Sequence, residues 1–400
     1  MNKRLIAALL GAGALAVTTV TAGVQGADAA SPRLTHISGL HAQRVCAKPA
    51  AGHAACLSKV MVNSKGVKPM ATLPLSTALS PDQIRHAYNL VNSNSGGRTV
   101  AIVDAYGYPN LERDLTIYRN FYNLPACTTA NGCLKIVNQS GNPSPLPATD
   151  LGWSQEQALD VDAVSAACPD CKILVVQSNS ASFADLGTAV NAAAGAGVVA
   201  ISNSYGGGDA PDSTYGKYYN HSGIAVTAST GDNGYKGASY PASSHYVTAV
   251  GGTSLKMSST TRGSETVWSG AGSGCSSYNA AITAASPFGT GCAGRAMADV
   301  SAAADPNTGG LSVYAPTSNT ASTWSQYGGT SESSPIIASV YALAGGGYSN
   351  ATPYGHPTNL FDITSGSNSK RKCPATQWCT ARTGWDGPTG LGTPNGTGAF

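Results

Sequence analysis

The stretch TVAIVD at residues 99–104 decides the fold of this chain. It is a short, almost continuous apolar run, as expected of a strand that is buried on both faces of a parallel sheet. Four similar runs follow it: KILVVQ at 172–177, VVAIS at 198–202, IAVTA at 224–228 and YVTAV at 246–250. The intervening segments carry helical patterns at 110–122, 153–167 and 182–196. This alternation predicts an α/β fold: doubly wound, with a mostly parallel sheet and helices on both faces.

The carboxyl ends of the predicted strands mark the expected position of a functional site. In doubly wound sheets, ligands bind at this edge. We therefore expect the loops that begin at Asp104, Asn203 and Thr230 to converge with the turn that leads into Ser331.

Ser331 lies at the start of a predicted hydrophobic helix, in the run GTSESSPIIASVYALA at 329–344. Its hydroxyl would be close to free backbone N–H groups and the positive end of the helix dipole, where developing negative charge is stabilised. Pro335 is expected among the first-turn amides, which lack helical acceptors in any case. Ser331 is thus a candidate nucleophile. The alternative is an ordinary Ser N-cap on a buried helix.

A nucleophilic serine needs a base, and histidine is the usual one, in the chain order Asp, His, Ser for a subtilisin. Asp104, at the end of the first strand, would suit the Asp. Between Asp104 and Ser331 the histidines are His221 and His245, and neither lies in a Gly-rich motif that opens a helix. We expect both to be loop residues rather than bases.

Three acidic residues offer a different base. Glu156 and Asp160 are four residues apart on the predicted helix 153–167, so they share one face. In a partly apolar cleft, two such carboxylates repel, raise each other's pKa and titrate as a pair. Asp232 follows a strand in STGDNG at 229–234, where the glycines allow a turn toward the same cleft. The alternatives are a solvated helix face and an ordinary turn.

The order of these motifs resembles the sedolisin family, serine-carboxyl peptidases that share a subtilisin-like fold and carry Glu in place of the catalytic His. The resemblance spans roughly residues 80–400. Besides the acidic residues and the serine motif, it includes YPAS at 240–243, which leads into AVGGT at 249–253.

The resemblance implies a role for each candidate residue. Ser331 would be the nucleophile, Glu156 the general base, and Asp160 the partner that orients Glu156 and shares its proton. Asp232 would be an oxyanion-hole group that must be protonated to donate, while the acidic pair must keep a negative charge. Because both demands are met only at acidic pH, we expect a bell-shaped rate profile centred below neutrality. The resemblance leaves Asp104 without a role: it would either assist the acid network or cap a strand end, and we favour the cap.

Two other functions are open at the level of the sequence. One is a subtilisin-like protease with a Ser-His-Asp triad, and the other is an exported non-catalytic binding protein on the same fold. The intact set of three acids and a serine weighs against the second. Glu332 stands where the family usually has a small residue, and it would either add a charge near the site or point to solvent.

The C-terminal stretch is suited to a hard cation. NLFDITSG at 359–366 and TGWDGPTGLG at 383–392 offer two carboxylates and Gly-rich turns that expose carbonyl groups. The resemblance implies one structural Ca²⁺ site, with these ligands: Asp362, Asp386 and the carbonyls of Ile363, Arg382 and Gly384. The family usually has Gly where Arg382 stands, and Arg still supplies a carbonyl. The alternative is an ordinary pair of Asp-containing turns.

Residues 1–30 have the layout of a secretory signal peptide: Lys3 and Arg4, then an apolar stretch, then small residues ending in ADA at 27–29. A transmembrane anchor is the alternative for this segment. We expect residues 31–78 to be a short pro-segment or N-terminal extension and residues 79–400 to be the peptidase domain with the calcium site. The mature protein is expected to be secreted and extracellular, free of the membrane, and monomeric.

The composition of the chain limits the classes of molecule that it is expected to bind. Only 11% of residues are charged and the net charge is +3, which argues against nucleic acid. Protein or peptide substrates are what the family resemblance implies. The ten cysteines fall in local couples that predict disulfide bonds: Cys46 with Cys56, Cys127 with Cys133, Cys168 with Cys171, Cys275 with Cys292, and Cys373 with Cys379. A redox or zinc half-site is the alternative for the CPDC motif at 168–171.

Overall fold

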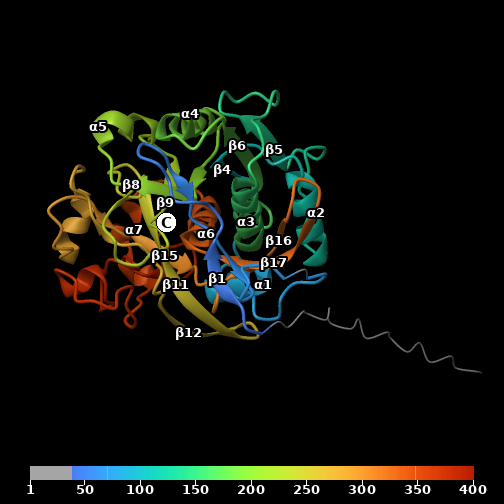
Figure 1. The fold of residues 1–400 in the computed structure, drawn as a ribbon. Coiled ribbons are helices and arrows are strands. Elements are labelled where there is room, and N and C mark those ends of the chain that lie inside the picture. The colour runs from blue at the N-terminus through green and yellow to red at the C-terminus, as the bar shows by residue number, and fades with distance from the viewer. Residues whose placement is uncertain (1–37, 70, 347) are drawn as a thin grey trace, which may run out of the picture. The chain divides into compact units, whose positions relative to one another are not determined.

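The predicted parallel sheet is present in the computed structural model, which describes residues 38–69, 71–346 and 348–400 (Figure 1). Across the sheet, the strand order is β12 (Thr261–Val267), β11 (Thr248–Ser258), β9 (Ala225–Ser229), β7 (Ala200–Asn203), β4 (Thr99–Ala105), β6 (Lys172–Ser178) and β5 (Leu134–Asn138). A further strand, β15 (Val300–Ala303), pairs with β11. The neighbours are parallel, except for the antiparallel pair of β11 and β12. The α/β fold is confirmed, and the predicted signal peptide lies outside the described residues.

Two hydrophobic cores, one on each face of the sheet, explain why β4 is apolar throughout. Side chains alternate across a strand, so Val100 and Ile102 enter one core and Ala101 and Val103 enter the other. The first core contains apolar side chains of α1 (Pro81–Ala87), α2 (Leu111–Phe121), α3 (Leu151–Ala167) and α6 (Thr330–Ala344). The second contains those of α4 (Phe183–Ala194). Figure 1 shows α3 and α6 side by side, with α4 apart from them.

The helix starts follow local capping rules. At α1, the Ser80 side chain accepts from the Gln83 amide and the Gln83 side chain accepts from the Ser80 amide, which completes a capping box with Pro81 in the first turn. At α3, the Asp150 side chain accepts from the Trp153 amide at 2.9 Å. Such a cap contributes about 1 kcal/mol to helix stability. The cap of α3 therefore fixes the register of the helix that carries Glu156.

The expectation for Pro335 is corrected by the start of α6. The helix begins at Thr330, so Pro335 stands beyond the first-turn amides and removes a helical hydrogen bond to the carbonyl of Ser331. The Ser204 hydroxyl donates to that carbonyl instead, at 3.2 Å. The proline thus frees the Ser331 carbonyl for a bond to the loop after β7.

The N-terminal described residues form strands that pair with the rest of the chain. β1 (His41–Arg44) and β3 (Lys59–Val62) join β17 (Ser322–Gly328) and β16 (Leu311–Pro316) in an antiparallel sheet. Between them, β2 (Ala55–Cys56) pairs with β8 (Tyr205–Gly208), which also pairs with β10 (Ser239–Tyr240). The described part of the predicted pro-segment therefore belongs to the same compact unit as the sheet.

The remaining elements are short. β13 (Gly274–Cys275) pairs with β14 (Ala296–Met297), and β18 (Leu360–Phe361) pairs with β19 (Thr393–Pro394). The short helices are α5 (Asp212–Tyr215) and α7 (Thr352–Gly355). Within the described residues, none of the helices has the length and apolar character needed to cross a bilayer.

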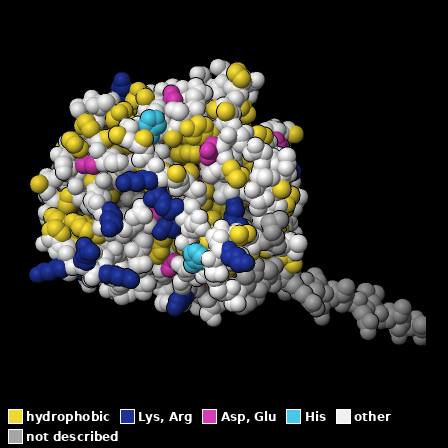
Figure 2. All heavy atoms as spheres, viewed as in Figure 1, with side chains coloured by type: hydrophobic (Ala, Val, Ile, Leu, Met, Phe, Trp, Pro, Cys, Tyr) yellow, Lys and Arg dark blue, Asp and Glu magenta, His cyan; other side chains and the backbone are white. Residues whose placement is uncertain are grey.

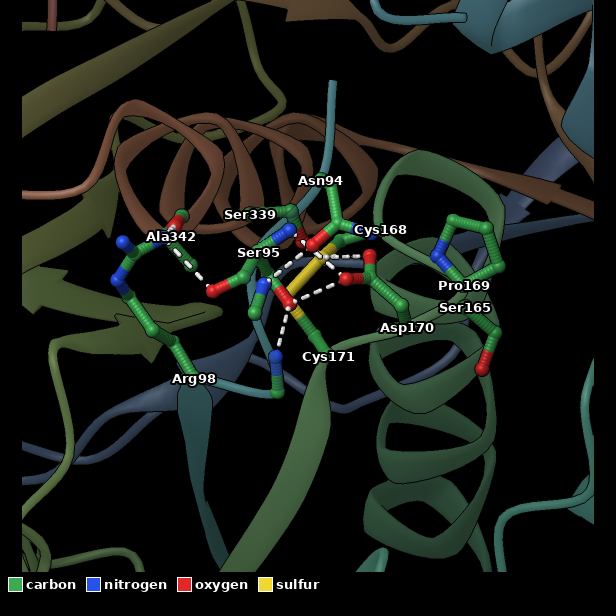
Figure 3. The surroundings of a disulfide bond; sticks show 12 residues. Asn94, Ser95, Arg98, Ser165, Cys168, Pro169, Asp170, Cys171, Ser339 and Ala342 are labelled. Atoms are coloured by element: carbon green, nitrogen blue, oxygen red, sulfur yellow. Dashed lines mark hydrogen bonds between the residues drawn. A yellow bond between two sulfur atoms is a disulfide. The ribbon is translucent and has the colours of Figure 1, made fainter. Parts of the chain in front are cut away.

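All five predicted cysteine couples are disulfide-bonded. Figure 3 shows the Cys168–Cys171 bridge at the end of α3, with Asp170 beside it. The Asp170 carboxylate accepts from the Ser95 amide and hydroxyl, both at 2.8 Å, which ties the loop before β4 to this turn. Because the two sulfurs bond each other, the structural bridge is confirmed over the zinc half-site.

Candidate active site

The candidate nucleophile Ser331 lies in the first turn of α6 and is fully buried. Its hydroxyl donates to the carbonyl of Ser204 at 3.3 Å, and Ser204 directly follows β7. The expected convergence of the loop after Asn203 with the turn into Ser331 is therefore observed.

Glu156 and Asp160 are fully buried on α3, so the solvated helix face is excluded. Burial, partly offset by the hydroxyls of Ser331 and Ser58, raises the pKa of Glu156 to about 8. Burial and the neighbouring charges of Asp104 and Glu156 raise the pKa of Asp160 well above its usual range. The two Asp160 carboxyl oxygens have no hydrogen-bond partner among the described residues. These carboxyls cannot all be ionised together and share protons as a group.

Asp104 belongs to this acidic group, which corrects the expectation that it caps a strand end. It lies near the end of β4, is fully buried, and neither of its carboxyl oxygens has a hydrogen-bond partner in the described chain. Burial and the charge of Glu156 raise its pKa well above the usual range. Sequence analysis noted its position at a strand end, and that position at the functional edge of the sheet was the relevant signal.

Asp232 reaches the same region from the loop after β9. Its Oδ1 accepts from the Thr330 amide at 2.8 Å and from the Thr330 hydroxyl at 2.9 Å. Its Oδ2 is buried without a hydrogen-bond partner among the described residues. Burial, offset in part by the charge of Lys59, raises the pKa of Asp232 to about 6. One oxygen is thus held in place while the other is free to carry a proton.

Gly329 allows Asp232 and the serine motif to come together. Its φ is +115°, a region that favours glycine, and a Cβ there would stand 2.5 Å from Asp232 Oδ2. The same Cβ would stand 2.3 Å from the carbonyl oxygen of Leu57. The backbone at Gly329 therefore passes directly beside both oxygens.

The N-terminal residues that complete this site were not among those predicted from the sequence. The Ser58 amide donates to Glu156 Oε2 at 3.0 Å, and Lys59 Nζ donates to the Asp232 carbonyl at 2.6 Å. Lys59 also lies over the ring of Trp268, 5.0 Å from its centroid. Because these contacts join residues about a hundred or more positions apart, no local pattern could have revealed them.

The two histidines proposed for the alternative triad bond elsewhere. A ring nitrogen of His221 bonds the Tyr218 carbonyl at 3.0 Å, and one of His245 bonds the Ala280 carbonyl at 3.1 Å. No contact links either ring to Ser331 within the described residues. Their assignment as loop residues outside the site fits this geometry.

Two further acidic residues are buried outside the acidic group. Glu332 is fully buried rather than pointing to solvent, and burial raises its pKa, with a lesser contribution from Asp305. Asp162 is buried on α3, and the charged groups that affect its pKa are Asp114 and Arg119. The charged residues that affect the pKa of Glu332 and of Asp162 are therefore not members of the acidic group formed by Glu156, Asp160 and Asp104.

The residues expected to bind calcium lie together near the C-terminus. The Gly384 amide donates to Asp362 Oδ2 at 2.9 Å, and the Arg382 amide lies 3.4 Å from Asp386 Oδ2. Burial raises the pKa of Asp386 to about 7, and the charge of Asp362 adds to the increase. Within the described residues, no hydrogen bond ends on the carbonyl oxygens of Ile363, Arg382 or Gly384. Two nearby carboxylates with free carbonyls are oxygen donors of the kind Ca²⁺ takes.

The face of the molecule that β1 crosses is rich in cationic side chains. Figure 2 shows Lys and Arg side chains gathered near the middle of this face. A cavity of about 270 Å³ beside the Asp232 loop has Arg44, Lys48 and Lys236 in its walls. The cavity thus combines a basic border with the glycine-rich strand β8.

Comparison with known proteins agrees with the fold. The Subtilase family matches residues 141–360. Kumamolisin from Bacillus sp. (strain MN-32) is 29% identical over 80% of this chain and 62% of its own length. Xanthomonalisin from Xanthomonas sp. (strain T-22) is 32% identical over 38% of this chain and 21% of its own length.

Solved structures share the fold. A Pseudomonas sedolisin, described as a serine-carboxyl proteinase complexed with two molecules of pseudo-iodotyrostatin, superposes with a TM-score of 0.66 at 22% identity. That comparison covers 82% of this chain and 96% of the sedolisin chain. The chain spans less than two thirds of the length of the curated relatives named above. By its sequence and fold, the chain belongs to the subtilase family and, within it, to the sedolisins.

Proposed function

We propose that the chain is a serine-carboxyl endopeptidase that hydrolyses peptide bonds at acidic pH through an acyl-enzyme. The observation that carries the proposal is the set of buried carboxyls around Ser331, with Glu156 and Asp232 on elements far apart in the sequence. No histidine contacts the Ser331 hydroxyl among the described residues, so a carboxylate has to take its proton.

The mechanism assigns one task to each group. Glu156 takes the proton of Ser331 as its oxygen attacks the carbonyl carbon of the substrate. Asp232, protonated on Oδ2, donates to the oxyanion that forms. Glu156 then passes its proton to the departing amine, and water hydrolyses the acyl-enzyme. Asp160 and Asp104 share the negative charge of the group and thereby keep Glu156 able to accept a proton.

The pKa values define the expected pH range. The pKa of Asp232 is raised to about 6, so the neutral form that donates to the oxyanion is lost as pH rises through that value. On the acid side of the profile, activity falls when Glu156, Asp160 and Asp104 are all protonated, because no carboxylate is then left to accept the proton of Ser331. Burial raises the pKa of Glu156 to about 8 in the described structure, so solvent has to reach Glu156 before it can stay ionised at acidic pH. We expect the maximum of the profile below neutrality, because the neutral form of Asp232 is required.

The C-terminal loops fit a structural calcium ion. Asp362, Asp386 and the carbonyls of Ile363, Arg382 and Gly384 would hold it. A bound cation would neutralise the buried Asp386 carboxylate and join the loops at 359–366 and 383–392. We assign it to stability only, because none of these residues contacts Ser331 or Glu156 in the described chain.

The predicted signal peptide and the five disulfides support secretion to an oxidising environment. Protein or peptide substrates and a monomeric mature form are part of the same proposal. Residues 31–78 are, in the same proposal, a short pro-segment or N-terminal extension.

Hydrolysis of a denatured protein at about pH 3 to 7 tests the proposed function. The secreted chain is compared with Ser331→Ala and Glu156→Gln, purified in the same way. We expect both variants to lose activity by at least about 100-fold. Equal hydrolysis by all three proteins would refute the assignment.

A further inference from the structure

The cavity beside the Asp232 loop lies next to the group that is proposed to bind the oxyanion. It has a volume of about 270 Å³, and its wall contains both the loop 230–234 and the glycines of β8. Asp232 Oδ2 would donate to the carbonyl oxygen of the scissile bond, and the side chain of the same substrate residue begins two bonds from that carbonyl carbon. We therefore expect the cavity to receive the side chain on the acyl side of the scissile bond.

Glycine residues keep this cavity open. Gly206–Gly208 of β8 and Gly231 of the Asp232 loop contribute only backbone to its wall. A Cβ at Gly208 or at Gly231 would have nothing within 4 Å, so the space beside both residues is open. The selectivity of the cavity therefore depends on the longer side chains at its border.

The charged side chains at the border are cationic, apart from Asp232 itself. Arg44, Lys48 and Lys236 line the cavity, and Asp232 is the acidic residue among its described wall residues. Burial raises the pKa of Asp232 to about 6, so its carboxyl is neutral in more acidic solution. A positive potential in a cleft attracts groups of the opposite charge. At acidic pH the border of the cavity therefore favours an anionic substrate side chain.

The ammonium group of Lys236 is available to such a side chain. Lys236 is exposed, and no hydrogen bond or ion pair joins its side chain to another described residue. Asp209, directly after β8, is engaged elsewhere: its carboxylate accepts from the hydroxyls of Ser243 at 2.7 Å and Ser276 at 3.1 Å, and from the Ser277 amide at 2.9 Å. The acidic residue that follows β8 is thus held by three donors and leaves Lys236 without a partner.

Lys236 differs from the other two cations in its place in the chain. Arg44 and Lys48 belong to residues 31–78, the proposed pro-segment or N-terminal extension, whereas Lys236 belongs to the expected peptidase domain, residues 79–400. Lys236 also follows Asp232 by four positions, so one loop carries both the oxyanion group and the cation. Lys236 is therefore the border cation that stays beside Asp232 whether or not the N-terminal residues are retained.

We propose that Lys236 is a specificity-determining residue, which selects peptides with Glu or Asp on the acyl side of the scissile bond. The inference rests on the proposed function and names its substrate class. The Lys236 ammonium group donates to the side-chain carboxylate of the substrate, while Asp232 donates to the carbonyl oxygen of the same residue. Glu is favoured over Gln, which has the same shape, because only Glu carries a negative charge.

The preference for Glu over Gln should depend on pH. A Glu side chain in a peptide has a pKa of about 4.3, whereas Lys and Arg side chains stay protonated in acidic solution. Near pH 3 the substrate carboxyl is neutral, and the preference should disappear. Above about pH 6 an ionised Asp232 would repel the substrate carboxylate. The selection of acidic side chains therefore belongs to the mildly acidic range between these limits.

Two peptides that differ only by Glu or Gln before the scissile bond test the proposal, through kcat/KM at about pH 5.5 and about pH 3. We expect wild type to prefer the Glu peptide by at least about threefold at the higher pH and by nothing at the lower. Lys236→Met should lose at least half of this preference, and Lys236→Glu should reverse it. Lys135→Met is the matched control, because Lys135 is an exposed lysine on the edge strand β5.

Three results would overturn the inference. They are equal kcat/KM for the two peptides with wild type at about pH 5.5, a preference that Lys236→Met keeps in full, and a preference that Lys135→Met loses as well. The last of these would assign the effect to the net charge of the protein rather than to the cavity. In each case the proposed function stands, provided that wild type hydrolyses the peptides and Ser331→Ala does not.

Failure of the proposed function itself has a different signature. If wild type hydrolyses neither peptide at any pH, the peptidase assignment fails. Binding of the two peptides, labelled with a fluorophore, to Ser331→Ala then measures the charge preference of the cavity without hydrolysis. Tighter binding of the Glu peptide that is lost when Lys236→Met is added supports the assignment of Lys236, and equal binding of both peptides contradicts it. Thermal unfolding of each variant shows whether the fold is retained.

Discussion

The Ser58 amide donates a 3.0 Å hydrogen bond to Glu156 Oε2, across 98 positions of sequence. The link between β2 and β3 and the first half of α3 therefore meet at the candidate site. The bond gives Glu156 a partner that resembles the leaving nitrogen of a peptide substrate. The predictions below concern the groups around this contact.

Asp104→Asn should move the acid limb of the activity profile to lower pH, by up to about one unit. The Asp104 charge raises the pKa of Asp160, so its removal lets the remaining carboxyls keep a negative charge in more acidic solution. Initial rates of peptide hydrolysis between about pH 2 and 6 measure the limb.

Asp162→Asn is the matched control for Asp104→Asn. Asp162 is equally buried on α3, but its pKa depends on Asp114 and Arg119 rather than on the acidic group. We expect Asp162→Asn to leave the pH of the acid limb unchanged, whatever its effect on the stability of the protein. Equal shifts in both variants would mean that Asp104 has no special link to the base.

Asp232→Asn should remove the alkaline limb near pH 6 while keeping measurable activity. An Asn side chain can still accept from Thr330 through its oxygen and donate to the oxyanion through its amide, which does not titrate in this range. Asp232→Ala lacks any donor and should lose about 100- to 1000-fold in kcat at every pH. An alkaline limb that persists in Asp232→Asn would assign that limb to another group.

Gly329→Ala should abolish activity. The added Cβ would stand 2.5 Å from Asp232 Oδ2, and the backbone has a φ of +115°. Gly237→Ala is the control, because Gly237 also has a positive φ, of +98°, and nothing lies within 4 Å of its Cβ position. Peptide hydrolysis and thermal unfolding of both variants separate backbone strain from the clash at the oxyanion group. Similar activity in the two variants would count against a crowded oxyanion site.

Calcium removal should lower the unfolding temperature by roughly 5–10 °C. Asp386→Asn should lower it by a similar amount and abolish the response to chelator, because a ligand is already missing. Asp170→Asn changes a carboxyl that accepts from Ser95 instead, and it should keep the full chelator response. Scanning calorimetry with and without EGTA measures the difference. A chelator response that survives in Asp386→Asn would place the ion elsewhere.

Local patterns predicted the parts of this structure that depend on neighbours in sequence. The apolar run of β4, the Ser80 cap and the sequence-local disulfides each follow from residues close together. The same holds for Glu156 and Asp160, whose spacing on α3 already indicated a shared face.

The features that could not be predicted from the sequence depend on contacts between residues that are far apart in the chain. The segment before residue 79 showed no period, because β2 and β3 pair with the distant strands β8 and β17. Asp104 looked like a strand-end residue until the fold placed it against Glu156. The role of Pro335 likewise depended on Ser204, which lies 127 positions before Ser331.

The pH dependence of kcat/KM for a peptide substrate tests the central claim most directly, because this quantity reports the essential acid and base of the free enzyme. We predict a bell-shaped profile with its maximum below neutrality, since the neutral form of Asp232 is required and its pKa is raised to about 6. A profile that climbs through neutrality to a plateau near pH 8 would contradict it and indicate a histidine base.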